Sequence, residues 1–97
     1  MIQTGVVFFG YGNEPTWNLG AGSDSRTFTT PDIHFAQPFP NTPTMVLAIN
    51  GIDSDHNTNL RVSLEPLDVE KDEFNIKINA WADTRLYGIW VTWIAND

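Results

Sequence analysis

Two residues with clear binding chemistry, Trp81 and Arg61, belong to predicted strands whose outward faces are otherwise polar. An indole ring packs well against the apolar C–H face of a pyranose, and the forked donors of an arginine can reach ligand hydroxyls or a carbonyl. Both residues also have a purely structural interpretation. Trp81 could cover the rim of a sheet, and Arg61 could be a surface cation over an aromatic ring.

A glycine-rich segment, Gly20–Ser25, offers a second set of polar groups. The side-chain oxygens of Ser23 and Asp24 can accept hydrogen bonds from ligand hydroxyls. The alternative is an ordinary flexible loop. The glycines do not form a dinucleotide-binding fingerprint, because the third glycine and the strand–helix context are missing.

Patterns typical of catalysis or metal binding are scarce. No nucleophile motif stands near His34 or His56, and the absence of cysteine excludes thiolate zinc sites. The segment Asp53–Asn57 resembles the start of a calcium loop, but Thr58 stands where glycine is needed and Leu64 where the bidentate glutamate belongs. We therefore predict no catalytic residue, no metal and no cofactor, although twelve acidic residues leave a glycosidase pair open.

The elements that position these residues are predicted to be strands. Apolar residues alternate with a period of two, and no segment of helical length shows the 3.6-residue period. The predicted strands are Gln3–Phe9, Thr27–Phe35, Thr44–Ile52, Leu60–Leu67, Phe74–Ala82 and Tyr87–Ala95. Because short turns rich in Gly, Pro, Asn and Asp separate them, we predict an all-β fold, a six-stranded antiparallel β-sandwich, with residues 1–97 forming one domain.

The fourth and fifth predicted strands indicate which of their faces is buried. Their apolar residues alternate with polar ones and should point to the core; they are Leu60, Val62 and Leu64, then Phe74, Ile76, Ile78 and Ala80. A hairpin that turns near Lys71 pairs Val62 with Ala80 and keeps these apolar faces together. The same register places Arg61 beside Trp81 on the outward face.

Charge and hydropathy exclude several classes of partner. Five Lys and Arg against twelve Asp and Glu give a net charge of −7, which should repel nucleic acid and anionic membrane surfaces. No apolar run approaches the ~18–20 residues of a membrane helix. The last predicted strand is apolar on both sides between Ile89 and Ile94, which predicts that one side meets another chain. The compartment stays open, with a secreted, cell-surface or virion-associated protein all compatible with the sequence.

The segment Ile33–Phe39, followed by Pro43 and an apolar strand, resembles the first half of an H-type lectin domain. This is the module of snail agglutinins and of the C-terminal part of discoidins. The second half of the match consists of Asp53, the segment from Asn59 to Val62, Phe74, Trp81, Thr84, Tyr87, Trp93 and Ile94. The resemblance extends from Gln3 to Ala95.

The resemblance implies a six-stranded sandwich that assembles as a homotrimer. It also implies metal-independent binding of glycans with terminal N-acetylgalactosamine (GalNAc) or galactose, in shallow grooves between protomers. The implied sugar-binding residues are Ser23 and Asp24 in one loop, Arg61, Trp81 as an aromatic wall, Ala82, and Tyr87 across the groove. We expect Asp24 and the Arg61–Trp81 pair to reach one sugar from different chains.

One position departs from the family. Ala82 follows the tryptophan where the best-known members have a histidine that helps to hold the acetamido group. The preference for an N-acetylated sugar is therefore open, and Asp83 is a candidate substitute. The alternative functions are a trimeric assembly module, such as a tail or tip domain, whose sugar site has decayed, and less favourably a small carboxylate-dependent glycosidase.

Overall fold

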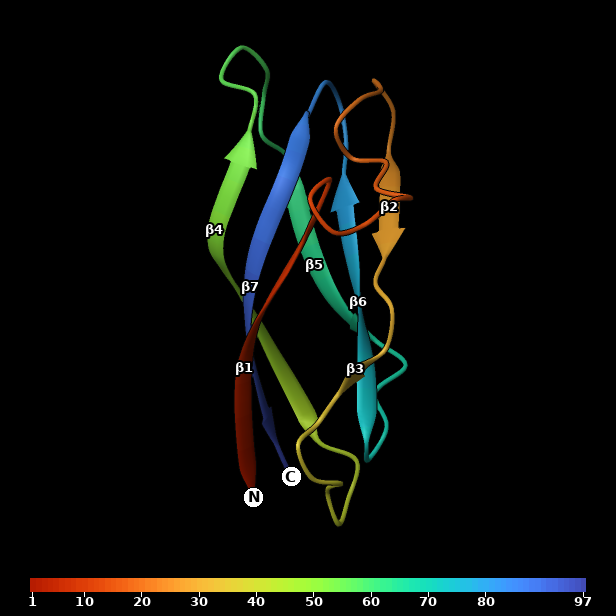
Figure 1. Cartoon of the computed structure of the whole chain (residues 1–97), viewed down its shortest axis with the longest axis vertical. Helices are drawn as coiled ribbons and strands as arrows, with labels where there is room; N and C mark the ends of the chain where they lie inside the picture. The colour runs from red at the N-terminus through yellow and green to blue at the C-terminus, as the bar shows by residue number, and fades with distance from the viewer.

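The computed structural model describes residues 1–97 as antiparallel β-strands with no helix, so the all-β prediction is confirmed (Figure 1). The strands are β1 (Ile2–Gly10), β2 (Arg26–Thr29), β3 (Ile33–His34), β4 (Thr44–Ser54), β5 (Val62–Leu67), β6 (Glu73–Ala80) and β7 (Leu86–Asn96). No helix long and apolar enough to cross a bilayer is present.

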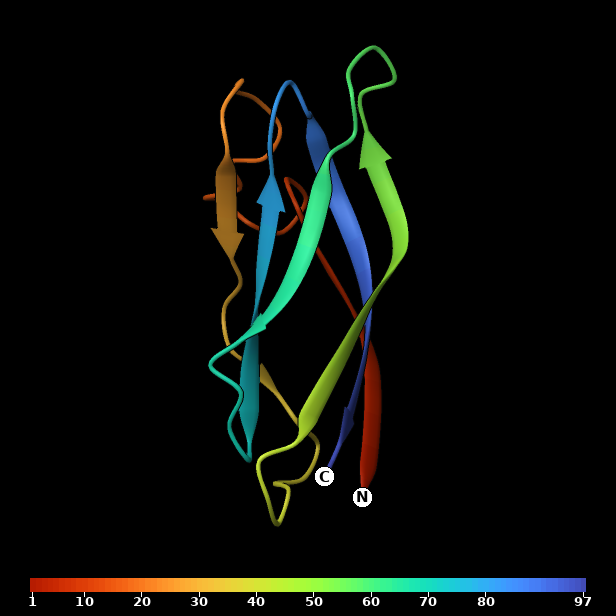
Figure 2. The same cartoon turned by 180° about the vertical axis from the view of Figure 1, so that it is seen from behind.

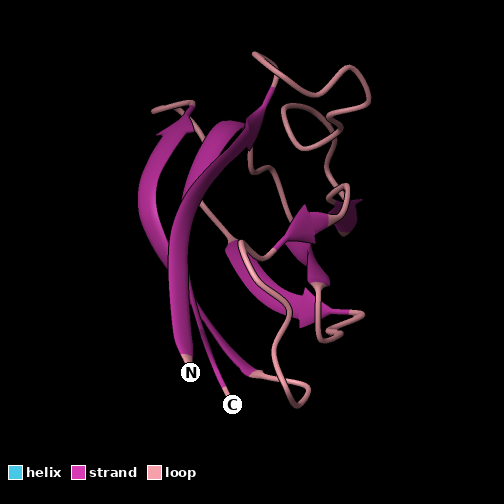
Figure 3. Ribbon diagram, turned by 60° about the horizontal axis from the view of Figure 1, so that its bottom comes forward, coloured by secondary structure: helices cyan, strands magenta, loops and turns pink.

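Two sheets pack against each other in an elongated sandwich that measures 45 × 20 × 19 Å. One sheet has the order β1-β7-β4. In the other, β6 is central, with β5 along one edge and β2 followed by β3 along the other (Figures 1 and 2). A view tilted by 60° shows the three long strands of one layer apart from the shorter strands of the other (Figure 3). The predicted sandwich is therefore present, and its two central strands, β6 and β7, supply most of the core.

The predicted strand Thr27–Phe35 is divided into β2 and β3, so the structure has seven strand segments where six strands were expected. Pro31 lies at the break and has no N–H to donate to a ladder. Beside it, buried Thr30 keeps contact with β6: its amide donates to the Ile76 carbonyl at 3.0 Å, and its hydroxyl accepts from the Ile76 amide at 2.9 Å. The chain thus follows one edge of β6 without a continuous ladder.

The core lies between the inner faces of β6 and β7. Its members there are Phe74, Ile76, Ile78 and Ala80 from β6, and Ile89, Val91, Trp93 and Ala95 from β7. The predicted inner face of β6 is confirmed. Leu60 was wrongly assigned to the core: its side chain is 49% exposed, because β5 begins only at Val62 and Leu60 lies in the preceding loop.

The outer side of the β1-β7-β4 sheet is also apolar. Its large side chains are Ile2, Val6, Val46, Trp90 and Ile94, all between 40% and 69% exposed, and we call this set the outer apolar face. Ile94 stands opposite Val46 in the β4–β7 register, and the rings of Phe8 and Trp90 lie 4.6 Å apart. Because Trp93 points into the core, the structure identifies Trp90 and Ile94 as the outward residues of the last strand.

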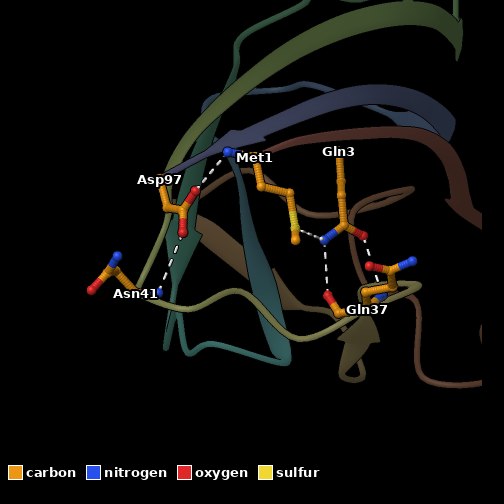
Figure 4. A network of polar contacts seen from close by, with 5 residues as sticks. All are labelled: Met1, Gln3, Gln37, Asn41 and Asp97. Carbon is orange, nitrogen blue, oxygen red and sulfur yellow. Dashed lines mark hydrogen bonds and ion pairs between the residues drawn. The ribbon is translucent and has the colours of Figure 1, made fainter.

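Polar contacts join the two termini at one end of the sandwich (Figure 4). The Met1 ammonium lies 2.9 Å from Asp97 Oδ1, and the Asn41 amide donates to Asp97 Oδ2 at 3.3 Å. The ammonium group is the main reason that the pKa of Asp97 is lowered. Gln3 Nε2 donates to the Gln37 carbonyl at 2.8 Å. The loops that carry the candidate residues lie at the opposite end (Figure 1).

Candidate functional site

The start of β5 and the end of β6 bring Arg61 and Trp81 together. Val62 pairs with Ala80, as the sequence predicted, and one step beyond this pair the Trp81 amide donates to the Arg61 carbonyl at 3.3 Å. The predicted hairpin register is therefore confirmed, and Arg61 stands beside Trp81 at the loop-bearing end of the sheet.

The opposite edge of β6 brings the Asp24 loop to the same place. Arg26 Nη1 donates to the Asp24 carbonyl at 2.6 Å and to the Ala82 carbonyl at 3.1 Å, while Nη2 donates to the Thr84 carbonyl. Gly22 has a φ of 109° in this loop, and a Cβ there would lie 2.8 Å from Arg26 Cδ. Both the backbone conformation and the close approach therefore require glycine.

The turn between β6 and β7 is fixed by a buried hydroxyl. Thr84 has no exposed surface, and its Oγ1 accepts a hydrogen bond of 2.8 Å from the Arg61 amide. Its own amide donates to the Trp81 carbonyl at 3.4 Å. Ala82, within this turn, adopts a φ of 56°, a left-handed conformation that costs a non-glycine residue about 1 kcal/mol. The turn therefore holds Trp81 and Ala82 in a defined geometry on one side of Arg61.

The side chains of this end are available to a ligand. Trp81 is 39% exposed, and its ring packs on no other aromatic ring. The carboxylate of Asp24 and the guanidinium of Arg61 are exposed, and neither has a hydrogen-bond or ion-pair partner within the chain. The Ser23 hydroxyl is likewise exposed and unpaired. One chain therefore presents a carboxylate, a guanidinium and an indole beside the ends of three adjacent strands, β2, β5 and β6.

Asp83, the candidate substitute for the family histidine, has a local partner. Asn59 Nδ2 donates to Asp83 Oδ1 at 3.1 Å. That hydrogen bond is the main reason that the pKa of Asp83 is lowered, and the nearby charge of Arg61 adds a smaller effect. The carboxylate therefore stays ionised beside Arg61 and ties the β4–β5 loop to the turn.

Tyr87 belongs to the other sheet, at the start of β7. Its hydroxyl donates to Asp55 Oδ2 at 3.2 Å, and its ring lies 6.2 Å from that of Tyr11. The Asn57 amide donates to Asp55 Oδ1 at 2.8 Å and is the main cause of the lowered pKa of Asp55. Burial is the main cause of the raised pKa of Tyr87, and the bond to Asp55 adds to it. Within one chain, Tyr87 makes no such contact with Arg61 or Trp81.

The site is an open surface, since a single chain encloses no pocket. Three carboxylates that lie close together, those of Glu70, Asp72 and Glu73, are at the far end of β6 from Trp81. They therefore cannot act together with Arg61 and Trp81. At the site itself, the Asp24 carboxylate can accept hydrogen bonds and the Arg61 guanidinium can donate them. The Trp81 indole can cover the apolar face of a ligand ring.

Sequence reasoning missed Arg26 and Asp55. Arg26 bonds only to main-chain carbonyls, and such contacts leave no pattern of residue types. The available signal was indirect: a glycine four residues before an arginine, in a loop that leads into a strand. Asp55 belongs to the segment Asp53–Asn57, which the sequence excludes as a calcium loop, and only the structure brings it to Tyr87.

Comparisons with known proteins agree with this architecture. The model of the H-type lectin domain family matches residues 30–96, a range that includes Arg61, Trp81, Ala82 and Tyr87 but begins after Ser23 and Asp24. A curated protein of Fuscovulum blasticum, "ATP synthase subunits region ORF 7", is 31% identical over 64 residues, which cover 66% of this chain and 56% of that protein.

Two solved structures of discoidin II from Dictyostelium discoideum share the fold. One has a TM-score of 0.81 at 20% identity over 98% of this chain, and the other 0.83 at 19% identity over its full length. The chain spans 36% of each discoidin II chain and about half of the curated relative. Because the family match covers more than half of its residues, the chain belongs to the H-type lectin domain family.

Proposed function

We propose that this lectin domain binds glycans that end in N-acetylgalactosamine or galactose, without catalysis and without a metal. The observation that carries the proposal is the row of Asp24, Trp81 and Arg61 at one end of a single sheet, each with its functional group exposed. The three residues come from distant parts of the sequence and stand beside the ends of adjacent strands, and none of their functional groups has a hydrogen-bond partner inside the chain.

Each member of the row has a role that suits a sugar. The carboxylate of Asp24 accepts hydrogen bonds from two neighbouring hydroxyls, and the Arg61 guanidinium donates to the remaining oxygens. The exposed indole of Trp81 covers the apolar face of the ring. A neutral sugar also suits a chain whose net charge is −7, because no charge repulsion opposes its approach.

We further propose that the domain assembles as a homotrimer through the outer apolar face and that Tyr87 reaches the sugar of a neighbouring protomer. The Arg26 hydrogen bonds hold the Asp24 loop and the Ala82 turn together within one chain. These contacts support the proposal that Asp24 and the Arg61–Trp81 pair of one chain face the same sugar, as an alternative to the expectation that they reach it from different chains. Tyr87 becomes the cross-chain residue, because it lies near the start of β7, the central strand of the sheet that carries the outer apolar face.

A glycan array followed by calorimetry tests the function. We expect binding to terminal GalNAc or galactose with a Kd on the order of a millimolar to tens of micromolar, because a shallow site immobilises few ligand atoms. Asp24→Asn should weaken binding, whereas Asp53→Asn, an equally exposed carboxylate outside the row, should not. Failure of the intact oligomer to bind any such glycan would overturn the proposal.

The same samples distinguish the alternative functions. A glycosidase would release the chromophore from a chromogenic glycoside and would lose that activity when one carboxylate is changed to its amide. An assembly module with a decayed site would show a stable trimer and an empty array. The comparison of GalNAc with galactose also shows whether Ala82 has removed the preference for an acetamido group.

A further inference from the structure

Arg26 is an unusual cation within the chain. All of its hydrogen bonds go to main-chain carbonyls, those of Asp24, Ala82 and Thr84, and no carboxylate lies within ion-pair distance. Its Nε is buried without a partner. Removing a guanidinium from water without a counterion costs free energy. Its position therefore calls for an explanation other than ion pairing.

The three carbonyls belong to two segments, and both segments carry residues of the proposed sugar site. Asp24 lies in the loop that precedes β2, whereas Ala82 and Thr84 lie in the turn that follows β6 and begins at Trp81. The β2–β6 ladder starts at the Arg26–Ala80 pair, so no ladder contact joins the two segments beyond that point. The Leu86 amide, directly after the turn, donates to the Leu19 carbonyl at 2.8 Å, and the side chain of Arg26 makes the only hydrogen bonds that link Asp24 to Ala82 and Thr84.

We propose that Arg26 is a positioning residue that sets the spacing between the Asp24 carboxylate and the Trp81 indole; this inference rests on the proposed function. Its planar fork donates to both segments at once, with Nη1 shared between the Asp24 and Ala82 carbonyls and Nη2 directed at that of Thr84. A lysine keeps the charge but lacks the fork, so it cannot hold both segments in the same geometry.

Two backbone features indicate that the loop and the turn are shaped around this side chain. Gly22 leaves room for Arg26 Cδ where any Cβ would clash. Ala82 keeps a left-handed φ, and its carbonyl accepts from Arg26 Nη1 in that conformation. The glycine and the left-handed alanine each cost conformational free energy and stabilise nothing by themselves. Both are explained if the loop and the turn must accommodate the guanidinium in this position.

Calorimetry with methyl N-acetylgalactosaminide and methyl galactoside, on the oligomer as it exists, tests the inference. Arg26→Lys should keep the oligomer mass but weaken sugar binding about tenfold, the equivalent of one hydrogen bond to a charged group. Arg85→Lys is the matched control, since it changes another arginine beside the same turn whose guanidinium has no hydrogen-bond partner. Equal affinity of Arg26→Lys and the parent would overturn the inference.

A double-mutant cycle separates positioning from a general loss of structure. If Arg26 acts through the placement of Asp24, Arg26→Lys should lower the sugar affinity by less than about threefold in an Asp24→Ala background. A full tenfold loss in that background would contradict the inference, because the two residues would then act independently.

The backbone dynamics of the loop provide a test that does not depend on sugar binding. The amide order parameters of Ser23 and Asp24 should fall from about 0.85 in the parent to below about 0.6 in Arg26→Lys, and should not change in Arg85→Lys. If the parent binds neither sugar, the proposed function fails, but this measurement still tests whether Arg26 orders the loop. Unchanged order parameters would overturn that role.

Discussion

Ile94→Lys is the substitution that most directly tests assembly through the outer apolar face. Ile94 lies on β7, the central strand of its sheet, stands opposite Val46 on β4, and is 42% exposed. A lysine there adds a charge to the middle of the face. The core is untouched, because the neighbouring Trp93 and Ala95 point to the other side of the strand.

The magnitude follows from the exposure of the face. A fully buried large apolar side chain contributes about 1.5–3 kcal/mol, so each roughly half-exposed member gains about 1 kcal/mol on burial. Five such side chains give about 5 kcal/mol per protomer and about 15 kcal/mol per trimer. An unpaired ammonium buried in every copy costs several kcal/mol more and should abolish assembly.

Light scattering and thermal unfolding provide the assay. The parent should have a mass near three times 10.9 kDa, and Ile94→Lys should have the single-chain mass with a β-type circular dichroism spectrum retained. Leu60→Lys is the matched control: it adds the same charge at a side chain that is 49% exposed but lies outside the outer apolar face, and its mass should match the parent. A monodisperse parent monomer at micromolar concentration, or an Ile94→Lys protein with the parent mass, would refute the reasoning.

Three further substitutions test the site and its supports. Trp81→Ala should lose about 1–3 kcal/mol of sugar affinity by calorimetry, because one wall of the sugar is removed, while the oligomer mass stays unchanged. Thr84→Val should lose about 1 kcal/mol of stability in urea, because the part-buried amide of Arg61 loses its acceptor. Asp55 has a lowered pKa, so its contribution to stability is present above the unfolded value of about 3.9 and is lost as pH falls through the folded value. Between pH 2 and about 6, the melting temperature should therefore fall less steeply toward acid pH for Asp55→Asn than for the parent.

The sequence alone predicts most of the fold, because the chain alternates clearly where one face is buried. The β5–β6 hairpin shows this best: the apolar positions of Ile76, Ile78 and Ala80 fix both the inner face and the register, since a shift of one residue would expose them. The predicted strand boundaries are wrong where the alternation of apolar residues does not mark the end of a strand. Leu60 continues the alternation into the loop two residues before β5 begins, and Pro31 breaks a strand whose apolar residues resume beyond it.

The site is less predictable than the fold, because its supports are bonds to the main chain. Trp81, Arg61 and Asp24 stand out as residue types in polar surroundings. Arg26 and Thr84 hold them through carbonyl and amide groups, which every residue has, and no spacing rule marks these contacts. Sequence patterns therefore find groups that face a ligand more readily than groups that fix their positions.

The two surfaces of the domain are separated by the sandwich itself. Trp81 and Arg61 stand at the end of the β6 sheet, whereas Ile94 and its neighbours cover the outer side of the β7 sheet, with the whole core between them. A substitution on one surface therefore has no direct route to the other through side-chain contact. Tyr87 is the exception, because it belongs to β7 yet lies at the loop-bearing end of the sandwich with Asp55. If the folded Ile94→Lys monomer binds sugar more weakly than the parent, the neighbour's Tyr87 explains the loss; if it binds equally well, the row on one chain is the complete site.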